Sequence, residues 1–165
     1  MNIAIIFAGG SGVRMGAGMP KQFLEINGKP IIIHTLDNFQ NSPSIDKIYI
    51  SCKKDYITTL QDLTKRFAIT KVCGIVEGGS NGQDSIYRAL RAADAENDKD
   101  AIVLIHDGVR PFVSEEVIQK NIECVKQHGS AVTCTSFFET PILSKGGEEV
   151  EEMPLKKEMF TAQAP

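Results

Sequence analysis

Five short apolar runs along the chain have the length and composition of β-strands. Each holds six or seven residues and contains isoleucine, valine or both, which favours a strand over a buried helix. The runs cover residues 2–8, 47–52, 72–78, 101–107 and 131–136. We therefore predict five strands.

Segments with apolar residues near helical spacing separate these runs, at residues 30–40, 55–68, 84–97 and 114–129. The last is expected to begin with Ser114 as its N-cap and to end at Gly129. The alternation predicts an α/β protein with a Rossmann-like, mostly parallel twisted sheet and helices on both faces. In such a sheet a ligand binds beyond the carboxyl ends of the strands.

The pattern changes after residue 136. Residues 137–158 read as a polar hairpin with "KGGEE" as its turn, so we expect a protruding β-hairpin arm within a single domain spanning 1–165. The chain then stops at "TAQAP", an extended segment with no helix to cover it. We expect the natural protein to continue beyond this point.

Composition narrows the class of protein. The formal net charge is −3 with both signs mixed, which argues against a surface that coats nucleic acid. No apolar stretch approaches the roughly 20 residues that span a bilayer, and the N-terminus lacks the basic segment of a signal peptide. Four cysteines, Cys52, Cys73, Cys124 and Cys134, occur singly, mostly in apolar runs. We expect reduced thiols in a cytoplasmic protein rather than disulfides or a zinc site.

The most unusual stretch is "AGGSGVRMGAGMPKQF", residues 8–23, directly after the first strand. Its glycines allow close approach of a ligand to backbone amides, and successive amides form an anion-binding concavity. Arg14 and Lys21 add the positive charge that a triphosphate requires. The loop lacks the Walker A sequence, and Pro20 fits a dinucleotide-binding turn poorly. The alternative is an ordinary glycine-rich turn between a strand and a helix.

Two further strand ends carry candidate residues. "EGGSNGQDS", residues 77–85, offers Gly78, Gly79, Gly82 and Ser85 as small contacts beside a ring. A plain turn, capped into a helix by Asp84 or Ser85, explains this stretch equally well.

"IHDGVRPF", residues 105–112, follows the fourth strand. Asp107 is an oxygen ligand of the kind that Mg²⁺ accepts near phosphates, and Arg110 is placed to meet a second phosphate. A loop-capping role is the alternative for Asp107. For His106 we favour a structural role, as a hydrogen-bonded histidine at a strand end.

No pairing of a nucleophile with a base stands out in the sequence. A reaction whose attacking group is already a phosphate oxyanion needs no base, because the enzyme has only to align two phosphates and screen their charge. Arg14, Lys21 and a metal ion suffice for that chemistry.

Three motifs, "AGGSGVRMGAGMPKQF", "GGSNGQDS" and "HDGVRPF", occur in the order found in a known family. Over essentially its whole length the chain resembles the cytidylyltransferases that include methylerythritol 4-phosphate cytidylyltransferase and ribitol-5-phosphate cytidylyltransferase. The resemblance implies transfer of CMP from CTP to a polyol phosphate, with Mg²⁺ bridging the triphosphate and pyrophosphate released.

The resemblance also implies roles for individual residues. Arg14 and Lys21 match the two positions that stabilise the transition state, and Asp107 matches a metal-proximal aspartate. The arm carries Thr140 and Lys156, which with Arg110 are expected to bind the acceptor, the first two in a neighbouring subunit of a homodimer. The nucleotide-binding positions are Ala8, Gly9, Gly10, Ser11, Gly12, Gly78, Gly79, Ser80, Asn81, Gly82, Gln83, Asp84 and Ser85.

Three positions depart from the family pattern. Gly82 stands where relatives often carry arginine, Lys156 stands where arginine is usual, and Ala164 stands where a threonine is common. Lysine at position 156 keeps the positive charge but cannot donate the two parallel hydrogen bonds that an arginine guanidinium gives to a phosphate. Beyond Pro165 the family supplies a further acceptor-binding lysine and a metal-site aspartate.

The sequence leaves two alternatives open. One is a nucleotide-binding protein without turnover; a nicotinamide-dependent dehydrogenase is disfavoured by Pro20 and by "SCKKD" after the second strand. The acceptor is also open, since methylerythritol 4-phosphate and ribitol 5-phosphate both suit the motifs. "HDGVRPF" leans toward the ribitol enzymes without deciding between the two.

Overall fold

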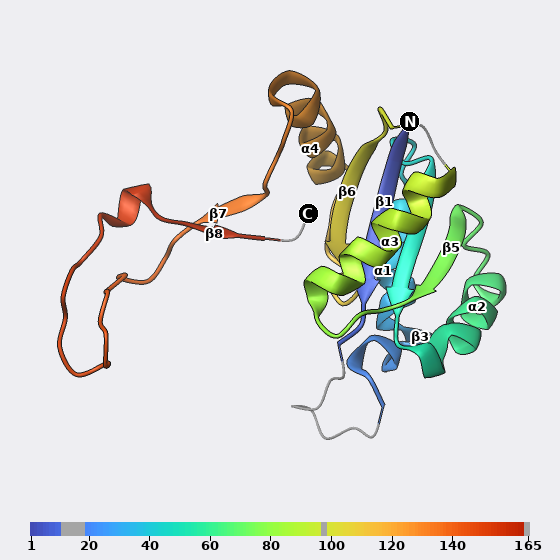
Figure 1. The fold of residues 1–165 in the computed structure, drawn as a ribbon, viewed down its shortest axis with the longest axis horizontal. Coiled ribbons are helices and arrows are strands. Elements are labelled where there is room, and N and C mark those ends of the chain that lie inside the picture. Colours follow the sequence, from blue (N-terminus) through green and yellow to red (C-terminus); the bar gives the residue numbers. More distant parts are fainter. Residues whose placement is uncertain (11–18, 97–98, 164–165) are drawn as a thin grey trace. The chain divides into compact units, whose positions relative to one another are not determined.

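The computed structural model describes residues 1–10, 19–96 and 99–163. Its central feature is a four-stranded sheet in which every neighbouring pair is parallel (Figure 1). The strands lie in the order β5-β4-β1-β6. Their bounds are β1 Asn2–Ala8, β4 Lys47–Cys52, β5 Val72–Glu77 and β6 Ile102–Asp107. The first four predicted strands and the parallel α/β fold are confirmed.

Helices cover both faces of this sheet. Their bounds are α1 Ile31–Asn41, α2 Ile57–Arg66, α3 Gly82–Glu96 and α4 Glu115–His128. Alternate residues of a strand point to opposite faces, and β1 shows the consequence. Ala4 and Ile6 pack in the core with α1, α2 and α4, while Ile3 and Ile5 pack against Ala89 of α3. The alternation of strands and helices therefore builds two apolar layers, one on each face.

The ends of α4 are those that the sequence predicts. The Ser114 hydroxyl accepts a hydrogen bond from the Val117 N–H at 3.4 Å, which satisfies one of the unpaired amides of the first turn. Gly129 ends the helix with a φ of 82°, a left-handed conformation that favours glycine.

Short elements between β1 and α2 were not predicted. They are η2 Lys21–Phe23, β2 Glu25–Ile26, β3 Lys29–Pro30 and η3 Lys54–Tyr56. β2 and β3 form a small antiparallel hairpin. The rings of Phe23 and Tyr56 stack with centroids 4.7 Å apart, so the two 3₁₀ turns, η2 and η3, pack together.

Residues 132–164 form a second compact unit, separate from residues 1–131. It contains β7 Cys134–Ser136, η4 Lys156–Glu158 and β8 Phe160–Ala162. β7 pairs antiparallel with β8 and with no strand of the four-stranded sheet. The expectation that residues 131–136 continue the parallel sheet is therefore wrong. The physical reason lies in the residues of β7, since Thr135 and Ser136 are polar and the strand lacks the isoleucine and valine side chains that the other strands bury.

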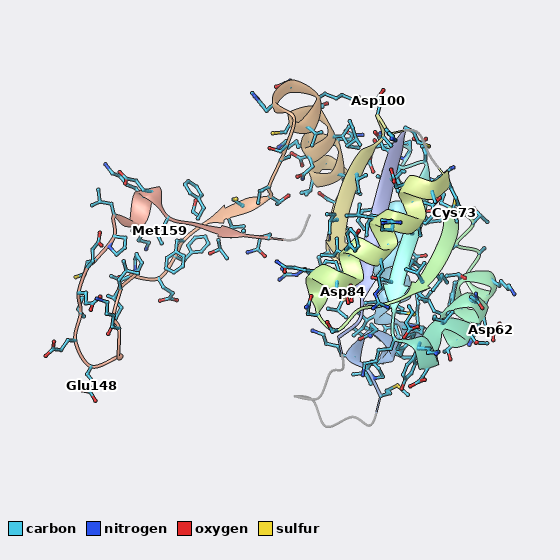
Figure 2. All side chains as sticks on the ribbon, viewed as in Figure 1. Asp62, Cys73, Asp84, Asp100, Glu148 and Met159 are labelled. Atoms are coloured by element: carbon cyan, nitrogen blue, oxygen red, sulfur yellow. The ribbon has the colours of Figure 1, made fainter. Side chains whose placement is uncertain are left out.

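The arm, residues 137–158, runs out from β7 and returns toward β8. Its two sides meet at an antiparallel bridge between Leu143 and Glu152. The "KGGEE" turn contains Gly147 with a φ of 79°, and the Gly147 N–H donates to the Ser144 hydroxyl at 2.9 Å. Figure 2 shows Glu148 at the tip of this excursion.

Replacing the N-cap of α4 tests the helix start. We expect Ser114→Ala to lower the free energy of unfolding by about 1 kcal/mol, because the Val117 N–H loses its partner. Urea unfolding measures this change. Ser130→Ala, beyond the end of the same helix, is the control and should leave the unfolding free energy nearly unchanged; equal values for the two variants would contradict the capping role.

Candidate active site

A cavity of about 480 Å³ lies at the carboxyl edge of the sheet. All four strands contribute to it through the segments that follow them. We call it the strand-end cavity; it is lined by Phe7, Ala8, Gly9, Gly10, Lys21, Gln22, Lys53, Gly79, Ser80, Asn81, Gly82, Ser85, Asp107 and Val109. Its position has a topological cause, because β1 has β4 on one side and β6 on the other. The chain order reverses at that point, and the crevice outside it is where open α/β sheets bind ligands.

The end of β1 and the first residues after it are held by one buried side chain. The Gln22 Nε2 donates to the carbonyl of Ala8 at 2.6 Å and to that of Gly10 at 3.2 Å. A side chain at Gly9 would place its Cβ 2.9 Å from the Ser85 hydroxyl, so this position needs glycine for the close approach of the next loop. Ser11, Gly12 and Arg14 lie outside the described residues.

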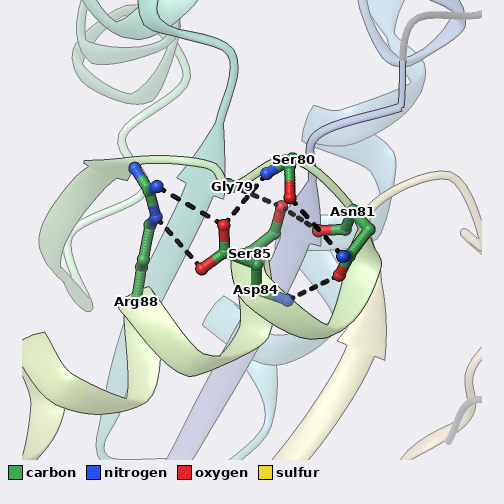
Figure 3. Close-up of polar contacts among 6 residues, drawn as sticks. All are labelled: Gly79, Ser80, Asn81, Asp84, Ser85 and Arg88. Carbon is green, nitrogen blue, oxygen red and sulfur yellow. Dashed lines mark hydrogen bonds and ion pairs between the residues drawn. The ribbon is translucent and has the colours of Figure 1, made fainter.

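The turn between β5 and α3 is organised by Ser85 (Figure 3). Its hydroxyl accepts from the Gly79 N–H at 3.0 Å and donates to the Asn81 carbonyl at 2.8 Å. The Gly78 N–H donates to the carbonyl of Cys52 at 2.7 Å, which ties the turn to the end of β4. Ser85 thus fixes the turn from a buried position.

Asn81 caps the start of α3. Its Oδ1 accepts from the Asp84 N–H at 2.9 Å, so neither Asp84 nor Ser85 is the cap that the sequence suggested as an alternative. Asp84 instead accepts from the Ser80 N–H at 3.0 Å and pairs with Arg88 (Figure 3). The Ser80 hydrogen bond, followed by that of Arg88, holds the pKa of Asp84 below its usual value. The Asp84 carboxylate therefore stabilises the turn between β5 and α3.

Other predicted nucleotide-binding positions differ in their exposure to the cavity. Gly78, Gln83 and Asp84 are not among its lining residues, whereas Gly82 is. A Cβ at Gly82 would meet no atom within 4 Å, so nothing in the described residues forces glycine there.

The end of β6 brings Asp107 to the cavity. Its Oδ1 accepts from the Val109 N–H at 3.2 Å, and its Oδ2 lies 3.8 Å from the Arg110 Nε. Asp107 therefore caps its own loop and also lines the cavity, while its role as a metal ligand stays a prediction. A Cβ at Gly108 would lie 3.1 Å from the Ala8 Cβ, so glycine allows this loop to approach β1.

The donor set fits a magnesium ion held mainly by substrate. Mg²⁺ is commonly bound by one or two carboxylates together with phosphate oxygens, and Asp107 supplies one carboxylate to the cavity. Within residues 1–10, 19–96 and 99–163, no group of three histidine, cysteine or acidic side chains is arranged to hold a metal by itself.

His106 is buried directly beside this loop. Its Nε2 donates to the carbonyl of Arg110 at 2.9 Å, and its ring lies 5.0 Å from that of Phe39. Nδ1 has no hydrogen-bond partner among the described residues, which fits a neutral imidazole. Burial, the largest influence, lowers the pKa of His106 below its ordinary value. The expected role as a hydrogen-bonded histidine therefore holds for Nε2 and not for Nδ1.

Sequence patterns did not mark four of the residues that line the cavity, Phe7, Gln22, Lys53 and Val109, of which Gln22 and Lys53 are the polar ones. Gln22 sits in "PKQF" beside Lys21, and nothing in the sequence marked its side chain as a support for the loop. Lys53 follows the second predicted strand, and the rule that ligands bind beyond the carboxyl ends of strands was available to find it.

The predicted acceptor residues fall in different parts of the chain. Arg110 is exposed at the end of the β6 loop. Thr140 and Lys156 belong to the second unit, where both are exposed.

A protein-family model described as IspD, 2-C-methyl-D-erythritol 4-phosphate cytidylyltransferase, matches residues 2–165. The chain belongs to this family. Among the described residues, no helix is long and apolar enough to cross a membrane.

Individual IspD-family relatives show the same likeness. Ribitol-5-phosphate cytidylyltransferase of Streptococcus agalactiae serotype Ia is 49% identical over 166 residues, covering 100% of this chain and 70% of that protein. The 2-C-methyl-D-erythritol 4-phosphate cytidylyltransferase of Clostridium botulinum (strain Langeland) is 37% identical, covering 99% and 70%. The crystal structure of 4-diphosphocytidyl-2C-methyl-D-erythritol synthase from Anaerococcus prevotii superimposes with a TM-score of 0.82 at 27% identity, covering 100% and 68%.

Removing the support of the first loop should affect both stability and ligand binding. We expect Gln22→Ala to lower the free energy of unfolding by about 1–3 kcal/mol, because the carbonyls of Ala8 and Gly10 lose a buried donor. CTP affinity should fall with it, since these residues line the cavity. Calorimetric titration and urea unfolding measure the two effects. Gln61→Ala, on the exposed face of α2, is the control; a Gln22→Ala protein that matches it in both measurements would refute the supporting role.

The buried histidine predicts a pH dependence of stability. Because the pKa of His106 is lowered on folding, the unfolded chain binds the proton more readily. The contribution of His106 to the free energy of unfolding is therefore fully present above the pKa that its ring has in the unfolded chain, about 6.5. This contribution is lost as the pH falls from there toward the lower pKa of the ring in the folded protein. We expect His106→Gln, whose amide can still donate to the Arg110 carbonyl, to show a shallower loss of unfolding free energy between about pH 7.5 and 5.5 than the wild type.

Urea unfolding at the two pH values measures this loss. His128→Gln, at the exposed end of α4, controls for the removal of a histidine as such. An equally steep loss in His106→Gln and the wild type would contradict the assignment to His106.

Proposed function

We propose that this protein transfers CMP from CTP to ribitol 5-phosphate and releases pyrophosphate. Cytidylyl transfer to a polyol phosphate follows from membership of the family and from relatives that carry this activity in their names. The single observation that supports a nucleotide as ligand is the strand-end cavity, which joins glycine-rich backbone, lysine and aspartate at one edge of the sheet.

The chemistry needs alignment more than proton transfer. An oxygen of the acceptor phosphate attacks the α-phosphorus of CTP, a new P–O bond forms, and the bond to the β-phosphate breaks with both electrons leaving on pyrophosphate. Because the attacking oxygen already carries negative charge, no general base is required. The enzyme's task is to hold the reacting phosphates in line and to neutralise the charge that gathers between them.

Lys21 and the loop after β1 are suited to this task. Lys21 lines the cavity and begins η2, whose Phe23 is buried and stacked on Tyr56. Its ammonium is therefore carried on a rigid turn, which favours a fixed position relative to the phosphates. The amides of Gly9 and Gly10 lie beside it in the same cavity. Arg14 remains the second proposed stabilising cation.

Asp107 is the proposed anchor for Mg²⁺. When bound, the ion would offset the charge of the triphosphate. The Asp107 carboxylate is held by the Val109 N–H, which orients it at the edge of the cavity.

The choice of acceptor rests on the relatives. Three relatives from Streptococcus agalactiae, each 49% identical, are named ribitol-5-phosphate cytidylyltransferases, whereas the methylerythritol phosphate relative is 37% identical. Arg110, Thr140 and Lys156 are the proposed acceptor-binding side chains.

We further propose that the second unit mediates a homodimer. Large apolar side chains of this unit are exposed, and exposed apolar surface of this kind often marks a protein–protein interface. They are Val132, Phe138, Ile142, Leu143, Val150, Met153, Leu155 and Phe160. A reducing, cytoplasmic environment stays a proposal, which rests on the single occurrence of each cysteine along the sequence.

A pyrophosphate-release assay tests the reaction and the acceptor together. With CTP and Mg²⁺, we expect release from the full-length protein with ribitol 5-phosphate and at least about 10-fold less with methylerythritol 4-phosphate, a difference of about 1.4 kcal/mol in transition-state binding. The reverse preference would refute the acceptor.

A matched variant separates turnover from binding. Lys21→Met should abolish most of the release, because it removes a cation that acts on the reacting phosphates. CTP binding without release by the wild type, with either acceptor, would favour a nucleotide-binding protein without turnover.

A further inference from the structure

Lys53 is a cationic residue of the strand-end cavity to which no role has been given. It follows the last residue of β4 directly and precedes η3, at the same sheet edge as the loops already described. Its side chain is half-buried. Within the described part of the chain its ammonium has no hydrogen bond or ion pair, whereas Lys29 pairs with Asp37 and Lys71 donates to the Ser42 carbonyl, each at 2.6 Å.

The charges that line the cavity favour an anion of more than one charge. Among its described lining residues, Lys21 and Lys53 carry positive charge and Asp107 alone carries negative charge. The Asp107 carboxylate is already turned toward Val109 and Arg110. Two ammonium groups in one concave site raise the local concentration of a polyanion and bind it more tightly than either does alone.

The topology places Lys53 on the nucleotide side of the cavity. β4 and β6 flank β1 on opposite sides, so Lys53 and Arg110 follow strands that do not touch each other. The Gly78 N–H donates to the carbonyl of Cys52, the residue before Lys53. Lys53 therefore adjoins the turn that carries Gly79, and lies away from the loop of Arg110, the proposed acceptor residue.

Packing links the two lysines. Lys21 begins η2 and Lys53 precedes η3, and the stacked rings of Phe23 and Tyr56 join these two turns. The Tyr56 N–H also donates to the Lys53 carbonyl at 3.0 Å, which fixes the backbone from which the side chain projects. Lys21 and Lys53 are thus carried by two turns that pack together at the carboxyl edge of the sheet.

We propose that Lys53 binds the triphosphate of CTP together with Lys21, as a second phosphate-binding lysine of the cavity. This inference rests on the proposed function, since it takes CTP as the ligand. It assigns Lys53 to the phosphates and not to the cytosine ring. The affinity that Lys53 provides should therefore depend on the charge of the ligand.

Calorimetric titration of the full-length protein with CTP and with uncharged cytidine tests the proposal. We expect Lys53→Met to weaken CTP binding roughly 10-fold or more, as loss of a charged hydrogen bond does, and to leave cytidine binding unchanged. Lys53→Arg should recover most of the CTP affinity. Lys54→Met, at the adjacent exposed position outside the cavity, is the matched control and should bind both ligands as the wild type does.

Salt provides a second, independent measurement. CTP affinity of the wild type should fall more steeply with increasing salt than that of Lys53→Met, because one screened charge has been removed. Thermal unfolding of each variant establishes that it is folded, and Lys53→Gln replaces Lys53→Met if the latter is not.

The outcomes separate this inference from the proposed function. Equal losses for CTP and cytidine, or a Lys53→Met protein that binds CTP as Lys54→Met does, would overturn the phosphate role of Lys53 alone. Absence of CTP binding by the wild type would overturn the proposed function and this inference with it.

Discussion

Parallel pairing of β1 with β4 on one side and β6 on the other is the constraint from which the site follows. The register runs from Ile3 opposite Lys47 to Ala8 opposite Cys52, and from Asn2 opposite Ile102 to Phe7 opposite Asp107. Strands paired in this way end at the same edge. The residues that follow them are brought together although they are far apart in the sequence.

Small residues let these strand ends converge closely. A Cβ at Gly9 would press on Ser85, and a Cβ at Gly108 would press on Ala8. Gln22 and Ser85 then satisfy backbone groups that such close approach would leave unpaired, and each does so from a buried position. The result is a set of hydrogen-bonded strand ends that line one cavity.

Much of this arrangement was predictable because it depends on local patterns. The strands at 2–8 and 47–52 and the caps of α4 at Ser114 and Gly129 are encoded by composition, spacing and single residues. The strand at 131–136 was misplaced because an apolar run does not specify its partner. Its pairing with β8 depends on residues about 25 positions later in the chain.

The parts of the site that were missed depend on tertiary contacts. Asn81, rather than Asp84, caps α3, and the choice between neighbouring polar residues is decided by where the helix begins. Gln22 bonds to Ala8 and Gly10, 14 and 12 positions earlier in the chain, and no local sequence pattern specifies these contacts. The rule for strand ends points to the segment after β4, but Lys53 and Lys54 are the same residue type, and only the structure shows that Lys53 lines the cavity and Lys54 does not.

The division of the chain into two units also bears on how acceptor choice can change within the family. Every described residue of the strand-end cavity belongs to residues 1–131, whereas Thr140 and Lys156 belong to residues 132–164. A cavity whose backbone is fixed by sheet register tolerates few changes, because a shift of one loop disturbs the next. The arm is less constrained, since its side chains are largely exposed. Among the described residues, its two sides are joined by the Leu143–Glu152 bridge and the exposed Lys145–Glu151 ion pair. On the proposed function, nucleotide recognition and the acceptor contact of Arg110 are thus tied to the fold itself, while Thr140 and Lys156 on the arm can be exchanged at little cost to stability.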